Sequence, residues 1–406
     1  MTEASEIVFN PFAPGFTDNP YPQYAELRIA APVSEHPLGF WLLTRYKDVH
    51  DLVLSDESVE LSNLGSNRYR SMLEQLYGAA VTPRMGGRAM MDQDDPDHLR
   101  LRKLVVKAFT PRAVAAIGPS ITKLVNDKLD SIADAGDADI VRDLAFPLPF
   151  DVISEMLGMP ATDHLRVRDL ANILAQSLEP GITPDAMRAI QAADEELAGI
   201  VREVLAWKRN NPADDLMSAL IAAEDNGDVL DDDELVSQVL LMYLAGFHNT
   251  VNLISNGVHA LLCNREQMAL LRSRPDLDEN AIEEILRFDA PGQLNRRVTV
   301  RDYRIGDIEI PAGAFVLASV ASANRDAEFW GPDADLLRLD RKNAKAHLSF
   351  SAGPRFCLGA ALARMEARIA IGGLIRRFDA LEPSGKMEWN GRINLRGPAT
   401  LPVSVK

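Results

Sequence analysis

The sequence predicts a mainly helical protein with a minor β-sheet region. Over most of the 406 residues, apolar side chains recur at the spacing of amphipathic helices, whereas strand-like segments are few and short. Pro and Gly are dispersed, and no repeat, low-complexity block or linker stands out, so residues 1–406 are expected to form a single domain. With 47% hydrophobic residues, the chain can bury a large core.

The expected elements follow in chain order. A helix at 22–28 precedes a strand at 40–44 and a helix at 45–54. Helices are then expected at 101–108, 117–135, 187–210, 233–263 and 280–288, followed by a strand at 303–310, a turn at 311–313 and a strand at 315–320. The 233–263 helix would run about 45 Å at ~1.5 Å per residue, and it is apolar on every side, which predicts a central, buried position.

Charge and cysteine content exclude several classes of protein. The net charge of -16 argues against non-specific nucleic-acid binding. Two cysteines form no disulfide framework and fit a reducing compartment. The first ten residues lack the pattern of a secretory signal, and the longest apolar run, 239–247, is far shorter than the ~20 residues of a membrane span. We expect a cytoplasmic monomer that binds neither nucleic acid nor membrane.

The most informative segment is 350–359, which places Cys357 between a glycine turn and the start of a helix. Unpaired N–H groups and the helix dipole at that position favour thiolate over thiol. Gly353 and Gly359 allow a sharp turn and the close approach of a flat ligand. Cys357 is therefore the best candidate metal ligand, although a lone cysteine without such a context is usually a buried structural thiol.

This segment resembles the haem-binding loop of the cytochromes P450. Phe350, Gly353, Arg355, Cys357 and Gly359 all match that pattern, while Ser351 stands where Gly is usual. The resemblance implies the cytochrome P450 fold, with one long helix crossing the haem and the cysteine loop on the opposite face. It also implies haem b as cofactor and Cys357 as the axial thiolate ligand of its iron.

Further motifs of the family occur in the expected order. By resemblance, His98 and Arg102 in the segment 95–102, together with Arg297 and Arg355, bind the haem propionates. Phe350, Gly359 and Gly246 are the other residues expected to contact the cofactor.

Glu284 and Arg287 are three residues apart on one predicted helix. Taken alone, such a pair is an ordinary surface ion pair worth ~0.2–0.5 kcal/mol. By resemblance, they form a buried structural network with Arg341 that supports the cysteine loop.

The segment expected to activate oxygen departs from the family pattern. When it is aligned on Ala245 and Gly246, His248 replaces the usual acid and Asn249 replaces the usual threonine. Asn249 keeps a hydrogen-bond donor and an acceptor. His248 could relay protons, or it could instead point toward a neighbouring helix as a core residue. A one-residue helical bulge would bring Thr250 to the haem in place of Asn249.

Substrate and partner sites are the least defined by sequence. By resemblance, substrate contacts come from Ala245, Leu294, Pro398 and Ala399, with the loops 60–91 and 166–183. A basic patch is expected near the cysteine for an acidic ferredoxin, and it comprises Arg100, Lys103, Lys107, Arg364 and Arg368. No flavin or nicotinamide module is recognisable, so a separate ferredoxin and reductase are expected to deliver electrons.

Three functions remain open at this point. The preferred one is a haem-thiolate monooxygenase that hydroxylates or epoxidises a small apolar molecule with dioxygen. The second is a haem-thiolate enzyme of atypical chemistry, namely oxidative coupling, desaturation or peroxide-driven turnover. The reason to consider it is that Asn249 stands where the family has threonine. The third is a non-catalytic haem protein that binds a ligand.

Overall fold

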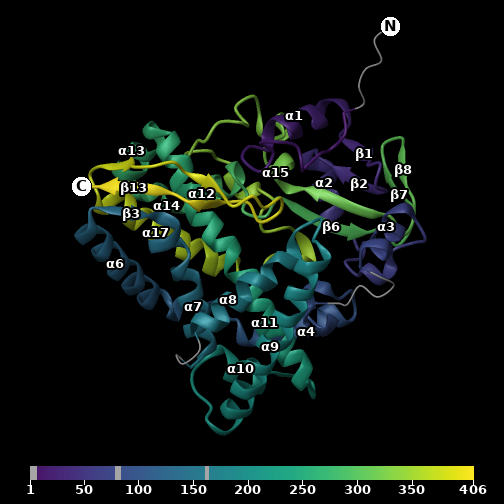
Figure 1. Cartoon of the computed structure of the whole chain (residues 1–406), viewed down its shortest axis with the longest axis horizontal. Helices are drawn as coiled ribbons and strands as arrows, with labels where there is room; N and C mark the ends of the chain where they lie inside the picture. Colours follow the sequence, from purple (N-terminus) through teal and green to yellow (C-terminus); the bar gives the residue numbers. More distant parts are fainter. Residues whose placement is uncertain (1–6, 78–83, 161–163) are drawn as a thin grey trace.

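The computed structural model describes residues 7–77, 84–160 and 164–406. Residues 78–83 of the expected substrate loop 60–91 lie outside the described residues. Figure 1 shows the four-stranded sheet on one side of the molecule and most of the helices gathered beneath and beside it.

The helices make up most of the described chain. They are α1 (Tyr21–Ala30), α2 (Tyr46–Leu54), α3 (Arg68–Tyr77), α4 (Asp97–Ala108), α5 (Pro111–Ala116), α6 (Gly118–Ala135), α7 (Pro147–Leu157), α8 (His164–Leu174), α9 (Pro184–Asn210), α10 (Leu216–Ala222), α11 (Asp232–Gly246), α12 (His248–Cys263), α13 (Arg265–Ser273), α14 (Asp278–Phe288), α15 (Val320–Ala323), α16 (Ala327–Trp330) and α17 (Ala360–Arg377). The mainly helical prediction is confirmed.

The strands are short and form five small sheets. They are β1 (Val33–Glu35), β2 (Phe40–Leu43), β3 (Asp137–Asp139), β4 (Glu224–Asp225), β5 (Asp228–Val229), β6 (Leu294–Val298), β7 (Tyr303–Ile305), β8 (Ile308–Ile310), β9 (Phe315–Ser319), β10 (Leu381–Pro383), β11 (Glu388–Trp389), β12 (Pro398–Thr400) and β13 (Pro402–Val405). The largest sheet has the order β1-β2-β9-β6, in which only β2 and β9 run parallel.

Local sequence explains where the main helices begin and end. Thr183 caps α9 through the backbone N–H of Ala186, and Asp231 forms a capping box with Glu234 at the start of α11. Gly136 ends α6 in the left-handed conformation, with φ +75°. These caps explain why the helix boundaries predicted from sequence differ from the observed ones by only a few residues.

Two expected elements were wrong in detail. The single helix predicted at 233–263 is two helices, α11 and α12, separated by Phe247, whose own dihedrals stay in the right-handed helical region (φ -85°, ψ -68°). The strand predicted at 303–310 is the hairpin β7–β8, since Gly306 turns the chain with φ +58°. The strand predicted at 315–320 exists as β9, but it pairs with β2 and β6.

Helices α6, α12, α14 and α17 pack together behind the cysteine loop. A Cβ atom at Gly257 of α12 would lie 2.7 Å from Ile371 of α17 and 3.2 Å from Ile285 of α14. The absence of a side chain there lets the three helices approach closely and fixes α17 relative to α12.

Among the described residues, no single helix combines the length and apolar character needed to cross a membrane. The bent pair 97–108 and 111–135 meets those criteria only when its two helices are counted together.

Candidate active site

The cysteine loop joins the 3-10 turn Gly353–Arg355 to the start of α17. The backbone N–H of Cys357 donates to the carbonyl of Phe350 at 2.9 Å, which closes the loop. Gly353 has φ +66°, and a Cβ atom there would lie 2.9 Å from Leu54. Ser351 also adopts a left-handed conformation, with φ +60°, at the position where the family pattern has Gly.

The Cys357 thiol combines exposure with a low-dielectric setting. Its side chain has solvent-accessible surface, yet burial raises the pKa of the thiol above its ordinary value. The backbone N–H groups of Gly359 and Ala360 oppose that shift, as do Arg102 and Arg364. The helix start therefore acts in the expected direction, against the effect of burial.

The Cys357 sulfur can bind a metal only with further donors. Within the ranges 7–77, 84–160 and 164–406, no group of three or more His, Cys, Asp or Glu side chains could hold a metal ion. The Cys357 thiol has accessible surface although many protein atoms surround it, as expected for a side chain that faces an internal cavity. A metal ligated here would therefore need a cofactor to supply its remaining ligands.

Cationic side chains gather beside the cysteine loop. His98 of α4 is 3% exposed, and its Nδ1 lies 3.1 Å from Asp95. Burial lowers its pKa, and the charge of Arg355 lowers it further, as does that of Arg102 to a smaller extent. Arg102 donates to the carbonyl of Phe356 at 2.7 Å, next to Cys357.

Arg297 of β6 is the most deeply buried arginine of this group. It is 5% exposed, its Nη1 donates to the carbonyl of Arg296 at 2.7 Å, and its Nε has no partner among the described residues. Burial lowers its pKa to about 10, with a further contribution from the charge of Arg355. Arg355 itself donates to the Gln93 carbonyl at 2.8 Å and to Asp94 at 3.1 Å.

These residues fit haem. An unpartnered guanidinium N–H in a buried cluster of cations calls for an anion, and haem has two propionate carboxylates. Cβ atoms placed on Gly359 and Gly246 would meet nothing within 4 Å, so open space adjoins both the start of α17 and the end of α11. Gly246 is exposed although it lies in the middle of the molecule's longest helical stretch.

The break at Phe247 lies in the segment expected to activate oxygen. Asn249 is half-buried, and its Nδ2 donates to the Ala245 carbonyl at 3.1 Å. The Thr250 hydroxyl donates to the Gly246 carbonyl at 3.1 Å, and its residue is only 3% exposed. Asn249 therefore retains accessible surface where Thr250 does not, which favours Asn249 over the bulge alternative.

His248 faces a neighbouring helix. It is 6% exposed, and its ring lies 4.5 Å from Phe247 and 6.3 Å from Phe146, measured between ring centroids. Burial lowers its pKa to about 3, and the charge of Arg392 contributes. With this pKa His248 is neutral at pH 7, so burial moves its titration away from neutrality, and its part in proton transfer stays a prediction. Its Nε2 has no hydrogen-bond partner among the described residues, so it is not a satisfied core residue either.

The Glu284 carboxylate lies at the centre of an ionic network behind the loop. Arg287 donates to both of its oxygens at 2.7 Å, and Arg341 donates to it at 3.2 Å. Glu284 and Arg287 are fully buried. Arg287 also donates to the carbonyls of Asn324, Ala334 and Leu336, which ties α14 to the segment leading to the cysteine loop.

The residues expected to contact substrate come from three elements. Ala245 is half-buried at the end of α11, and Leu294 is 9% exposed at the start of β6. A Cβ atom at Gly292 would lie 3.5 Å from the Asn249 side chain, so the segment leading into β6 adjoins α12. In β12, Pro398 is buried and Ala399 is exposed.

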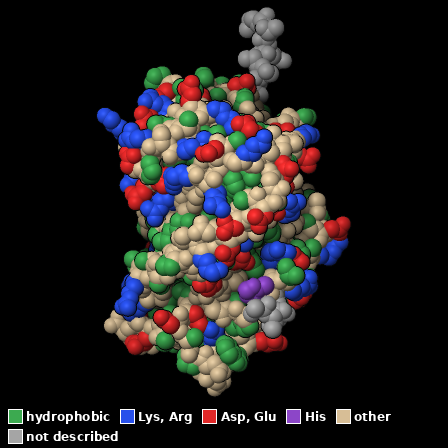
Figure 2. Space-filling view, turned by 90° about the vertical axis from the view of Figure 1, so that its left-hand side faces the viewer, with side chains coloured by type: hydrophobic (Ala, Val, Ile, Leu, Met, Phe, Trp, Pro, Cys, Tyr) green, Lys and Arg blue, Asp and Glu red, His purple; other side chains and the backbone are tan. Residues whose placement is uncertain are grey.

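The predicted basic patch is largely neutralised. Arg100 pairs with Asp228 and Glu234, Lys107 with Asp225, Arg364 with Glu283 and Arg368 with Glu279. Only Lys103 of the five lacks a direct ion pair among the described residues. On the face drawn in Figure 2, basic and acidic side chains are likewise interspersed. The expectation of a local excess of positive charge on these residues is therefore wrong.

Sequence reasoning missed a second charged cluster under the loop. His347 and Arg364 both bond to Glu283, at 3.0 and 2.8 Å, and Arg364 lies 4.5 Å above the Phe350 ring. Burial opposes ionisation of Glu283, but these two partners outweigh it and hold its pKa at about 2. No spacing in the sequence marks this cluster, because its members meet only when α14 packs on α17.

Comparison with known proteins identifies the family. The family model "Cytochrome P450" matches residues 150–400. Cytochrome P450 107B1 of Saccharopolyspora erythraea is 37% identical over 97% of this chain and 96% of its own length. The vitamin D(3) 25-hydroxylase of Pseudonocardia autotrophica is 39% identical over 89% of this chain and 87% of its own length.

A solved structure gives the same result at the level of the fold. The crystal structure of CalO2 superposes with a TM-score of 0.89 at 30% identity, covering 99% of both chains. Family model, full-length identity and fold agree with the motifs around Cys357, and the chain is therefore a haem-dependent enzyme of the cytochrome P450 monooxygenase family.

Proposed function

We propose that this enzyme hydroxylates or epoxidises a small apolar molecule, within one haem-thiolate domain formed by residues 1–406. The observation that carries the proposal is the Cys357 thiol, which is accessible at the start of α17 and receives the N–H groups of Gly359 and Ala360. Haem, when bound, supplies the activation of dioxygen.

The cofactor is held from one side of the site. Cys357 would ligate the iron, and His98, Arg102, Arg297 and Arg355 would bind the two carboxylates. Support for these roles comes from the unpartnered Arg297 Nε and from the mutual lowering of pKa among the cations. Phe350, Gly359 and Gly246 bound the space for the ring, because side chains are absent from both glycines.

Asn249 would position the water molecule that delivers protons. Its Nδ2 is used by the Ala245 carbonyl, which leaves the amide oxygen as an acceptor for a water molecule beside Gly292. His248 is neutral and turned toward Phe146, so it does not act as the acid. Ala245, Leu294, Pro398 and Ala399 contact the substrate.

Electrons come from a separate ferredoxin and its reductase. Since four of the five expected basic residues are paired with carboxylates, Lys103 is the remaining candidate contact for an acidic carrier. Charge reversal at Lys103 should slow reduction by a ferredoxin, and an unchanged rate would exclude its part in docking.

The second candidate function is peroxide-driven or otherwise atypical chemistry. It is favoured by one observation, the amide of Asn249 at the position where the family has a hydroxyl. Product formed with peroxide alone, but not with dioxygen, reductase and ferredoxin, would replace the preferred function by this one.

The decisive experiment is the carbon-monoxide difference spectrum of the reduced holoenzyme. The wild type and Cys263→Ala, which changes the other free cysteine, should both show the long-wavelength band of thiolate-ligated haem. Cys357→Ala should lose that band completely. Survival of the band in Cys357→Ala would overturn the assignment of the ligand.

A further inference from the structure

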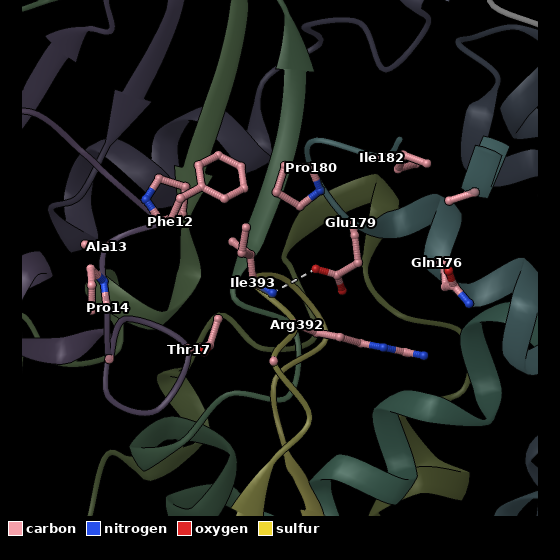
Figure 3. A pocket seen from close by; sticks show the side chains of 14 residues that line it. Phe12, Ala13, Pro14, Thr17, Gln176, Glu179, Pro180, Ile182, Arg392 and Ile393 are labelled. Carbon is pink, nitrogen blue, oxygen red and sulfur yellow. Dashed lines mark hydrogen bonds between the residues drawn. The ribbon is translucent and has the colours of Figure 1, made fainter. Parts of the chain in front are cut away.

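A surface cavity of about 610 Å³ lies away from the cysteine loop. It is bordered by the N-terminal segment 11–17, the connection between α8 and α9, and the loop that precedes β12 (Figure 3). Most of its lining is apolar, including Phe12, Pro14, Pro180 and Ile182. Two charged side chains, Glu179 and Arg392, also line it, and they differ in how well they are satisfied.

The Glu179 carboxylate is fully engaged by backbone. One oxygen accepts from the N–H groups of Ile393 and Asn394, at 2.8 and 2.9 Å, and the other accepts from that of Leu395 at 2.8 Å. Figure 3 shows Glu179 turned toward Ile393. Glu179 therefore anchors the loop. Its negative charge favours the charged form of Arg392, but the two side chains form no ion pair within 4.0 Å.

The Arg392 guanidinium has few hydrogen-bond partners and no ion-pair partner among the described residues. Its side chain is half-buried, and burial lowers its pKa. Among the described residues its guanidinium makes one hydrogen bond, 3.3 Å long, to the neutral amide of Asn172, and no carboxylate lies within 4.0 Å. A guanidinium carries five N–H donors, so most of them are available to a ligand.

Arg396, four residues further along the same loop, provides an internal comparison. It bonds to Asp289 at 2.7 Å and to the carbonyls of Thr17 and Asp18. Arg396 is thus a structural cation whose partners are all protein groups. Arg392 has no such set of protein partners, although its side chain is half-buried.

Arg392 also lies toward the oxygen-activating segment. Its charge reaches His248, the first residue of α12, and helps to lower the pKa of that imidazole. In Figure 3 its side chain extends from the loop toward the Gln176 side of the cavity. The guanidinium therefore lies between the apolar cavity and α12, and neutral His248 offers it no negative charge.

We propose that Arg392 binds the carboxylate of an otherwise apolar substrate. This inference rests on the proposed function and names the substrate class more closely. The apolar lining receives the hydrocarbon part, and the planar fork of the guanidinium receives the carboxylate in a bidentate, charge-assisted pair. Asn172 and Gln176 are neutral, and Glu179, already bonded to three backbone N–H groups, forms no ion pair with Arg392.

The test is equilibrium binding of alkanoates of 8 to 18 carbons to the holoenzyme, each compared with its methyl ester by calorimetry. We expect wild type to prefer at least one acid over its ester. Arg392→Gln should weaken binding of that acid roughly 10- to 100-fold, the range for loss of a charge-assisted hydrogen bond, with little change for the ester. Arg392→Lys should keep part of the preference.

Lys386→Gln is the matched control, because it removes one positive charge from the same C-terminal region at a fully solvated side chain. It should bind acid and ester as the wild type does. If no acid in the series is preferred over its ester, or if Arg392→Gln keeps the preference, the proposal is wrong.

Failure of this inference can be told apart from failure of the proposed function. Binding is measured without turnover, so an acid preference in an enzyme that forms no oxygenated product would overturn the proposed function alone. Turnover of neutral apolar compounds without any acid preference would overturn the role of Arg392 alone. The thermal unfolding midpoint of each variant shows whether it is folded.

Discussion

The two sides of the candidate site differ in how their polar groups are satisfied. On the cysteine side, the loop is backed by bonded networks, with Glu284 bound to Arg287 and Arg341 and Glu283 bound to His347 and Arg364. On the α11–α12 side, the helix is broken at Phe247 and the His248 Nε2 is without a partner. The cysteine loop is thus backed by two bonded ionic networks, while the break between α11 and α12 has a buried imidazole nitrogen without a partner.

The largest expected effect tests the rigidity of the cysteine side. Glu284→Gln leaves Arg287 with an uncompensated buried charge, while Arg341 keeps its ion pair with Asp333, and the change should lower the free energy of unfolding by ~3–5 kcal/mol. Chemical denaturation measures this. Glu279→Gln, on the same helix but in an exposed pair with Arg368, should cost less than ~0.5 kcal/mol. Equal losses would show that the network does not support the loop.

A second prediction concerns Glu366 of α17, which is 2% exposed and has an unpartnered Oε2. Burial raises its pKa from 4.5 to about 8. The folded protein therefore keeps a proton that the unfolded chain loses above pH 4.5, so this group makes stability fall as the pH rises from 4.5 to about 8. Below pH 4.5 both states are protonated, and the effect vanishes.

Glu366→Gln should remove that pH dependence. Relative to wild type, its stability should rise by roughly 2–4 kcal/mol between pH 5 and pH 8. Glu366→Leu should change with pH in the same way, since it too lacks the titrating group. Denaturation curves at the two pH values measure the difference, and a variant that follows the wild type at both would contradict the assignment.

The third prediction tests the other side of the site. Asn249→Ala removes the accessible amide, so at least ~10-fold less product should form per electron pair, about 1.4 kcal/mol, with the electrons diverted to peroxide. Asn249→Thr should retain coupling. Thr250→Val is the control, because that hydroxyl is buried against the Gly246 carbonyl. If Thr250→Val lowers the product formed per electron pair and Asn249→Ala does not, then Thr250, and not Asn249, has the role assigned here.

The smallest expected effect concerns the turn of the cysteine loop. Ser351 has φ +60°, a conformation that glycine adopts without steric cost, so Ser351→Gly should stabilise the protein by ~0.5–1 kcal/mol. Ser384→Gly, at a residue without positive φ, should instead be neutral or destabilising. Thermal unfolding of both variants distinguishes a strained turn from a general effect of glycine.

The sequence by itself determined the fold class and the candidate cofactor residues. Helix periodicity, caps and the motif around Cys357 are local patterns. They can be recognised in the sequence without knowing how the elements pack. The same holds for the Glu284–Arg287 pair, whose members are three residues apart on α14.

Only the tertiary structure decided the charge states and the partners. His248 is neutral because it is buried among Phe247 and Phe146, and the expected basic patch is neutralised by carboxylates from segments distant in sequence, such as Asp225 and Asp228 for α4. Arg392 stands out because, among the described residues, its guanidinium makes one hydrogen bond and no ion pair. Burial and pairing depend on which elements meet in space, and no spacing within one segment specifies that.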